Sequence, residues 1–217
     1  MDLLDLARGP GLQLAVTIFV AGLVWRLFHL YLMLKKTDLS EARQGGEIGG
    51  GIRAIFSRFR HHEPFRERTR NGTIIAYTVH IGLAVVVFGG APHILFIGSF
   101  TGLDWTPLPS IFIHIAAALT LAALLIALGR RIRHPVLRML SNFDDYFSWL
   151  VTTLPVLTGL LAVAHVGARY ETLLALHILS FEAFLIWFPF GKLMHSIIVF
   201  GSRYTTGVTF TRRGARV

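Results

Sequence analysis

The sequence contains no cysteine and carries little charge. The absence of cysteine excludes disulfides, iron–sulfur clusters held by the chain's own thiolates, and covalent Cys-x-x-Cys-His haem attachment. Only 15% of the 217 residues are charged and 53% are hydrophobic, whereas a soluble domain is about 25% charged. Any redox cofactor would therefore be held non-covalently, and the ten histidines are the strongest candidate ligands.

The apolar residues form five long runs separated by polar stretches. Each run is long enough to cross about 30 Å of hydrocarbon, and charges do not recur at every turn as they do in soluble amphipathic helices. The first run is too long for a signal-peptide core, so we expect it to remain as a helix. We predict an all-α membrane bundle, one domain over 1–217, with transmembrane helices at about 11–34, 73–100, 109–128, 146–166 and 172–200.

A shorter apolar pattern follows the first run. Ile52, Ile55, Phe56 and Phe59 recur at helical spacing, with arginines between them. This pattern predicts a cytoplasmic amphipathic segment over 52–60 that lies on the membrane surface.

The distribution of basic residues predicts the orientation. The formal net charge is +9, and eighteen of the 21 Lys and Arg residues fall on one side of the predicted bundle. The other side has only Arg8 and Arg169, while Arg26 lies within the first span. The positive-inside rule therefore places the N-terminus outside and the tail, 201–217, in the cytoplasm. We expect a multi-pass protein of the inner membrane. Membrane topology explains its basic loops better than nucleic-acid binding does.

Two histidines in the fifth run stand eighteen residues apart. On one continuous helix, His177 and His195 would face the same way about 27 Å apart, a spacing that suits two stacked haems. The alternative is that they are interfacial histidines at the two ends of a helix. His80, about 10 Å above the inner end of the second helix, would lie at the level of His195, and Gly82 follows it.

The outer level has several candidate ligands. His93 lies about 20 Å above His80, beyond Gly90 and Pro92, but about 140° away on an ideal helix unless the expected kink corrects this. His114 and His165 are competitors for the same level.

The other ionisable residues carry weaker signals. Arg26 shares a helix face with His29 and could form an ion pair with a haem propionate. The alternative is that both side chains extend toward the lipid headgroups. Glu182 is the carboxylate inside a span, where it could transfer protons or form a hydrogen bond to a neighbouring helix. Asp104 lies in a predicted outer loop, where it could receive protons. Three histidines in basic loops, expected to touch solvent, lipid phosphates or a partner, are His61, His62 and His134.

Several motifs resemble one family. The segments 77–82 (Tyr-Thr-Val-His-Ile-Gly) and 188–195 (Phe-Pro-Phe-Gly-Lys-Leu-Met-His), with 141–144 and Thr158-Gly159, resemble the gamma subunit of respiratory nitrate reductase, a five-helix di-haem cytochrome b. The resemblance runs from about Gly11 to the tail.

The resemblance implies specific ligands. It assigns His80 and His195 to an inner haem and His177 to an outer haem. The family's fourth ligand position is Gly90 here, so we expect His93 in that role, with His114 as the alternative. The family's outer quinol site uses a lysine, and this sequence has none on the predicted outer side.

The tail motif Thr211-Arg212-Arg213-Gly214 is similar to a sister branch, the membrane cytochromes of heterodisulfide-reductase-like and sulfite-reduction-associated complexes. Both branches imply a quinone-reactive electron-transfer subunit with haem b, and an iron–sulfur partner at the cytoplasmic face that is heterodisulfide-reductase-like or nitrate-reductase-beta-like. The alternatives are a mono-haem cytochrome, a proton-coupled transporter without haem, and a passive membrane anchor. A Soret band and histidine substitutions discriminate among them.

Overall fold

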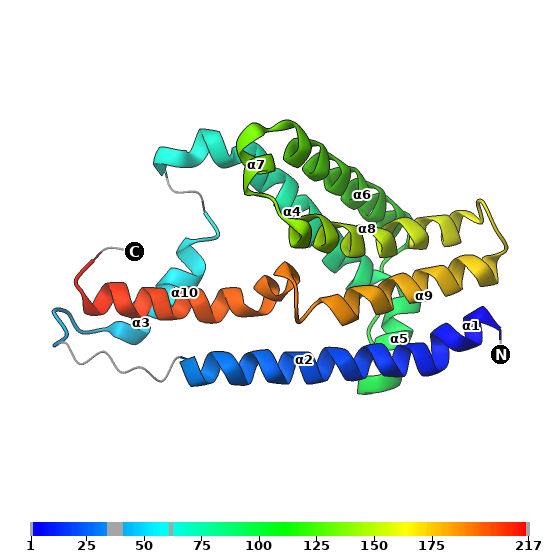
Figure 1. The fold of residues 1–217 in the computed structure, drawn as a ribbon, viewed down its shortest axis with the longest axis horizontal. Helices are drawn as coiled ribbons and strands as arrows, with labels where there is room; N and C mark the ends of the chain where they lie inside the picture. Colours follow the sequence, from blue (N-terminus) through cyan, green and yellow to red (C-terminus); the bar gives the residue numbers. More distant parts are fainter. Residues whose placement is uncertain (1, 34–40, 61–62, 216–217) are drawn as a thin grey trace. The chain divides into compact units, whose positions relative to one another are not determined.

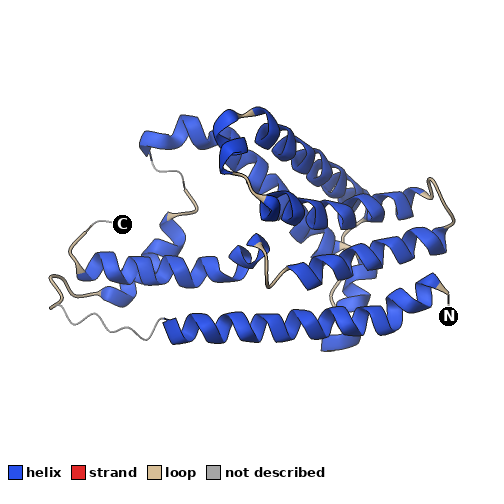
Figure 2. Cartoon of the chain, in the orientation of Figure 1, coloured by secondary structure: helices blue, strands red, loops and turns tan. Residues whose placement is uncertain are grey.

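The computed structural model describes residues 2–33, 41–60 and 63–215, and these ranges contain helices and connecting turns but no strand (Figure 2). Five helical segments are long and apolar enough to cross a membrane: Leu3–Met33, Glu63–Gly89, Ser110–Arg133, Phe143–Ala164 and Tyr170–Trp187. The predictions of an all-α chain with five candidate spans are confirmed. Leu34, His61, His62 and Arg216, which carried predictions, lie outside the described residues.

The first span begins earlier than predicted and is bent near its start. It comprises α1 (Leu3–Leu6), η1 (Ala7–Gly11) and α2 (Leu12–Met33). The Asp2 carboxylate accepts a 2.8 Å hydrogen bond from the Asp5 amide, which caps the first turn. The backbone leaves the helical conformation at Gly9, with φ −103° and ψ −106°, immediately before Pro10. A span starting at residue 11 was therefore too short.

The second predicted span, 73–100, is interrupted where a kink was expected, and the interruption is a complete break. The span consists of α4 (Arg66–Gly89) and α5 (Ala91–Thr101), separated by Gly90 in an extended conformation, with φ −78° and ψ 125°. Pro92 has no backbone N–H, so a straight helix would leave the carbonyl of Phe88 without its donor. α5 ends at Gly102, whose φ of 72° suits glycine.

The third and fourth spans are α6 (Ser110–Arg133) and α8 (Phe143–Ala164), joined by α7 (Pro135–Leu140). The predicted helix 109–128 stopped short of Arg133, and 146–166 began too late. α8 starts at Phe143 because Asn142 and Asp145 form a capping box, in which each side chain accepts from the other's backbone amide. α8 packs against α6 on one side and against the following helix, α9, on the other (Figure 1).

The predicted fifth helix, 172–200, is divided into two. α9 covers Tyr170–Trp187, and after a turn and η3 (Lys192–Met194) the chain forms α10 (His195–Arg212). Pro189 and an extended Gly191, with φ −98° and ψ −175°, lie at this break. His177 and His195 therefore lie on different helices. The distance of about 27 Å expected for eighteen residues of one continuous helix does not apply to them. The tail expected over 201–217 is helical as far as Arg212.

The chain divides into two compact units. One contains Met1–Phe19 and Asn71–Trp187, and the other contains Val20–Arg70 and Phe188–Val217. The prediction of a single membrane domain over 1–217 stays a prediction.

In the second unit, α3 packs along α10 (Figure 1). α3 covers Glu47–Ser57, so the amphipathic segment starts before the predicted residue 52 and its helix ends before 60. A short η2 (Glu63–Phe65) then precedes α4. A Cβ added at Gly207 of α10 would lie 2.5 Å from the Ala54 Cβ, so glycine allows the two backbones to approach.

Candidate functional site

The rings of His93 and His177 face each other inside the first unit. Their centroids are 6.0 Å apart and their planes are inclined by 40°. His93 belongs to α5 and His177 to α9, and both side chains are half-buried. A metal ion that binds two imidazoles at about 2 Å each holds their ligating nitrogens about 4 Å apart and their centroids about 6 Å apart. The spacing therefore fits two axial ligands on one metal.

The helix break at Gly90 sets the position of His93. The His93 Nδ1 lies 2.9 Å from the carbonyl oxygen of Val86, in the last turns of α4. A Cβ added at Gly90 would lie 2.9 Å from that same oxygen and 3.2 Å from the His93 Nδ1. Glycine is therefore required where the ring folds back over the break. The 140° mismatch expected between His80 and His93 on an ideal helix does not apply, because the helix is interrupted between them.

The loop after α5 satisfies the carbonyls that the break leaves without helical donors. The Trp105 indole Nε1 donates a 2.6 Å hydrogen bond to the carbonyl of Phe88. The Leu108 amide donates a 2.9 Å hydrogen bond to the carbonyl of Gly89. Within a bilayer an unsatisfied carbonyl is costly, so these two donors stabilise a break that would otherwise be disfavoured.

Three groups on α8 hold the ring of His177. Its Nδ1 lies 3.0 Å from the carbonyl oxygen of Pro155 and 3.4 Å from the hydroxyl of Thr158. A Cβ added at Gly159 would lie 3.1 Å from the His177 Cε1, so the absence of a side chain there lets the ring pack against α8. These contacts account for the Thr158-Gly159 pair that the sequence analysis singled out.

Both rings use Nδ1 for a backbone carbonyl. With Nδ1 as the donor, the tautomer is fixed and the lone pair of Nε2 is available to a metal. Within the described part of the chain, no hydrogen bond to the Nε2 of His93 or His177 is found. The centroid spacing and the Nδ1 contacts therefore leave both Nε2 atoms available to bind one metal ion.

The competing outer histidines lie elsewhere. His165 is exposed in the turn after α8, where it adopts φ 55° and stacks on Tyr170 with centroids 5.3 Å apart. His114 is exposed on α6. Neither makes the ring contact with His177 that His93 makes.

The predicted inner ligands belong to different units, His80 to the first and His195 to the second. The His80 Nδ1 lies 2.7 Å from the carbonyl oxygen of Ala76, and the His195 Nδ1 lies 2.7 Å from that of Lys192. Each Nδ1 thus lies near a backbone carbonyl three or four residues earlier in the chain, whereas at the outer pair the carbonyl belongs to another helix. Their pairing stays a prediction.

Glu182 is buried in α9, with 6% of its surface exposed. Its Oε1 has no hydrogen-bond partner among the described residues. A Cβ added at Gly11 would lie 2.8 Å from the Oε2, so this glycine of the bent N-terminal segment gives the carboxyl its space. An unpartnered carboxyl inside a span is a candidate proton site.

The remaining predicted site residues lie on the surface. Arg26, His29, Asp104 and His134 are exposed. In the described ranges their side chains make no hydrogen bond or ion pair. The roles assigned to them near a propionate or a quinone stay predictions.

A chain of hydrogen bonds between α8 and α9 was not predicted from the sequence. The Trp187 indole donates to the Ser148 hydroxyl at 2.9 Å, and that hydroxyl donates to Asp144 at 2.7 Å. Arg131 of α6 pairs with Asp145 at 2.9 Å. A serine four residues after Asp144 was the available signal in the sequence.

Across the described ranges, no group of three or more His, Cys, Asp or Glu side chains could hold a metal ion. This argues against a protein-only metal centre there. A haem differs because its macrocycle supplies four nitrogens and the protein supplies only the axial ligands. Two histidines therefore suffice for that cofactor.

The helices define a multi-pass membrane protein with a histidine pair inside its helical bundle. The chain belongs to the same family as a protein of Nitratidesulfovibrio vulgaris (strain Hildenborough) whose name is given only as "Protein". The two are 32% identical over 209 residues, which cover 94% of this chain and 87% of the relative. No family model and no solved structure matches the chain.

Proposed function

We propose that this protein is a di-haem cytochrome b, the membrane subunit that transfers electrons between the quinone pool and a peripheral iron–sulfur protein. The observation that supports it best is the His93–His177 pair, with its 6.0 Å centroid spacing. His80 and His195 are assigned to the second haem by the family resemblance and by their shared use of Nδ1.

The chain's own contribution at the outer site is to hold two imidazoles. The carbonyls of Val86 and Pro155 accept the Nδ1 protons, so each Nε2 would be available to ligate a haem iron. Hydrogen bonding at Nδ1 also makes each imidazole a more basic ligand. The haem, when bound, supplies one-electron transfer, and the protein supplies position and electrostatics.

Quinol oxidation releases protons, and the buried carboxyl of Glu182, five residues after His177 in α9, is suited to receive one. Its Oε1 has no partner in the described part of the chain. Gly11 leaves room beside it. The partner would bind the arginine-rich loops after the first and third spans, which the positive-inside rule places in the cytoplasm.

The test is a haem count. The purified protein, expressed with ample haem supply, should give a dithionite-reduced minus oxidised spectrum of b type and about two haems per chain by pyridine haemochrome. His93→Ala and His177→Ala should each remove the same haem, and His80→Ala and His195→Ala the other. No haem in a well-folded preparation would refute the proposal.

Matched controls are available among the other histidines. His114→Ala and His165→Ala remove imidazoles at the same predicted level as the outer pair, and both should keep the full haem content. If His114→Ala lost the outer haem and His93→Ala kept it, the outer ligand would be His114.

One observation favours a second candidate function. Glu182, buried in a span with an unpartnered oxygen, would also suit a proton-coupled transporter without haem. That protein would show no Soret band, and its transport would be lost in Glu182→Gln. A mono-haem cytochrome would keep the inner haem in both His93→Ala and His177→Ala, with no second haem in the wild type.

A further inference from the structure

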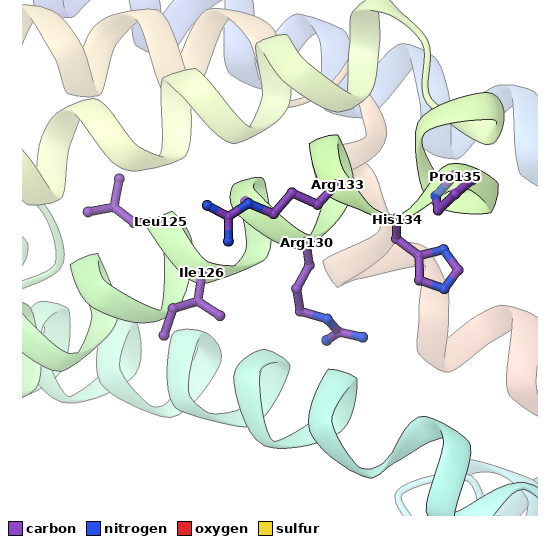
Figure 3. Close-up of a pocket in the computed structure, with 7 residues that line it drawn as sticks. Leu125, Ile126, Arg130, Arg133, His134 and Pro135 are labelled. Carbon is purple, nitrogen blue, oxygen red and sulfur yellow. The ribbon is translucent and has the colours of Figure 1, made fainter.

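An open pocket of about 660 Å³ lies at the C-terminal end of α6 (Figure 3). Its wall combines apolar side chains from the span with basic side chains from the last turn. The labelled lining residues are Leu125, Ile126, Arg130, Arg133, His134 and Pro135. No acidic side chain lines it.

The basic residues at this end of α6 are not equivalent. Arg131 is neutralised by Asp145 at 2.9 Å and also donates to the Ser141 hydroxyl at 2.9 Å. Arg130 and Arg133 have no ion pair among the described residues. The α6–α8 contact therefore uses one arginine and leaves two guanidinium groups at the pocket.

Arg130 is directed toward α4, as Figure 3 shows. A Cβ added at Gly72 of α4 would lie 3.4 Å from the Arg130 Nη1, so the absence of a side chain there leaves space for the guanidinium. The carbonyls of the last turn of α6 also lie at this end, and cations are favoured there. The arginines are thus held near the end of the span without an acidic partner.

The apolar part of the pocket continues into the span. Leu125 and Ile126 are 53% and 54% exposed, in a helix whose composition suits the bilayer interior. A ligand that fits both parts has an anionic head and an apolar chain. Soluble phosphate would match the arginines but would leave the apolar wall uncovered.

We propose that this pocket binds an anionic phospholipid, with its phosphate between Arg130 and Arg133 and an acyl chain along Leu125 and Ile126. Guanidinium groups bind phosphate with paired N–H donors, and His134 can add another. Basic pockets at the cytoplasmic ends of spans bind anionic headgroups in this way. The site does not depend on haem.

Native mass spectrometry of the full-length protein in detergent would test this with added phosphatidylglycerol and, separately, phosphatidylcholine. The wild type should retain phosphatidylglycerol in preference to phosphatidylcholine. The double variant Arg130→Gln/Arg133→Gln should bind phosphatidylglycerol roughly 25-fold more weakly, since each basic residue near anionic lipid contributes about a factor of five.

Two further variants keep the test decisive. Arg58→Gln/Arg68→Gln removes the same charge from two exposed sites outside the pocket and should bind as the wild type does. Arg130→Lys/Arg133→Lys keeps the charge and should retain most of the binding even if the glutamine variant folds poorly. Equal binding by the wild type and a folded glutamine variant would overturn the proposal.

Inorganic phosphate distinguishes the source of the phosphate group. Millimolar phosphate should not displace phosphatidylglycerol, because it lacks the chain that covers Leu125 and Ile126. Displacement at that concentration would overturn the lipid assignment in favour of a soluble anion. None of these readouts measures haem, so failure here is distinct from failure of the proposed electron-transfer function.

Discussion

The Trp105 indole donates a 2.6 Å hydrogen bond to the carbonyl oxygen of Phe88, across seventeen positions of sequence. That carbonyl lacks its helical donor because the residue four positions later is Pro92, which has no N–H. The indole therefore supplies the hydrogen bond that Pro92 cannot donate. The direction of α5, which carries His93 in its first turn, depends on this bond.

Replacing Trp105 by phenylalanine should destabilise this break. The carbonyl of Phe88 would lose its donor, at a cost of about 1–3 kcal/mol. We expect a lower midpoint of thermal unfolding in detergent and weaker retention of the outer haem. Trp25→Phe is the control, since Trp25 is 68% exposed. Equal losses in the two variants would show that the hydrogen bond has no special role.

Gly90→Ala tests the turn beneath His93. The new Cβ would lie 2.9 Å from the Val86 oxygen and 3.2 Å from the His93 Nδ1, so the ring or the helix end must shift. The outer haem should be lost or change its electron paramagnetic resonance signal, while the inner haem is retained. Gly201→Ala meets nothing within 4 Å and should behave as the wild type does. An unchanged outer signal in Gly90→Ala would contradict this account.

Gly159→Ala probes the other ligand from the side of α8. Its Cβ would meet the His177 Cε1 at 3.1 Å, a contact that a small rotation of the ring can relieve. We therefore expect the outer haem to remain bound with a shifted reduction potential, measured by redox titration followed at the α band. A shift confined to the other haem would disprove the assignment of His177.

Glu182→Gln removes a carboxyl charge from a buried site while keeping its size. Because Oε1 has no hydrogen-bond partner in the described ranges, the neutral amide should fold at least as stably as the acid. Haem content should be unchanged, and the rate of haem reduction by a quinol analogue should fall if the carboxyl accepts the proton. Glu171→Gln, at an exposed position in the first turn of α9, is the control. An unaltered rate would remove Glu182 from the proton route.

The contact between α3 and α10 offers a test with neighbouring glycines. A Cβ at Gly50 would overlap the Thr211 side chain, whereas one at Gly49 would meet nothing within 4 Å. Gly50→Ala should loosen the contact and speed hydrogen exchange in α10. Gly49→Ala should leave exchange unchanged or slower, because alanine favours a helix over glycine by about 1 kcal/mol. The reverse order would mean that the two helices do not pack through Gly50.

The sequence predicted the spans better than it predicted their interruptions. Hydropathy locates a membrane helix because the whole run must be apolar, so all five candidate spans were found. Breaks depend on single residues: the kink expected near Pro92 is present as a complete break, whereas the break beside Pro189 was not predicted. A proline in a membrane helix is often tolerated when another group satisfies the freed carbonyl, so its presence alone does not show that the helix ends.

The outer histidine pair was partly predictable. His177 and His93 were both candidates from the sequence, but helical geometry alone placed His93 on the wrong face. What reorients it is the extended backbone at Gly90, together with donors from Trp105 and Leu108 in a loop more than ten positions away. Hydrogen bonds of that range leave no periodic trace in the sequence, and the same holds for the pocket at Arg130 and Arg133.

The interruption after Trp187 also limits the length of α9. Its eighteen residues rise about 27 Å, less than the roughly 30 Å of a typical hydrocarbon layer, whereas the 24 residues of α6 rise about 36 Å. Tyr170 and Trp187, aromatic residues that favour the headgroup boundary, stand at the two ends of α9. The last turn of α6 contains Arg130, Arg131 and Arg133, however, so its apolar part, 111–128, is also about 27 Å long. The first unit thus presents two matched hydrophobic lengths to the surrounding lipid, both slightly shorter than a typical hydrocarbon layer. The fold therefore suits a bilayer that is a few ångströms thinner than average.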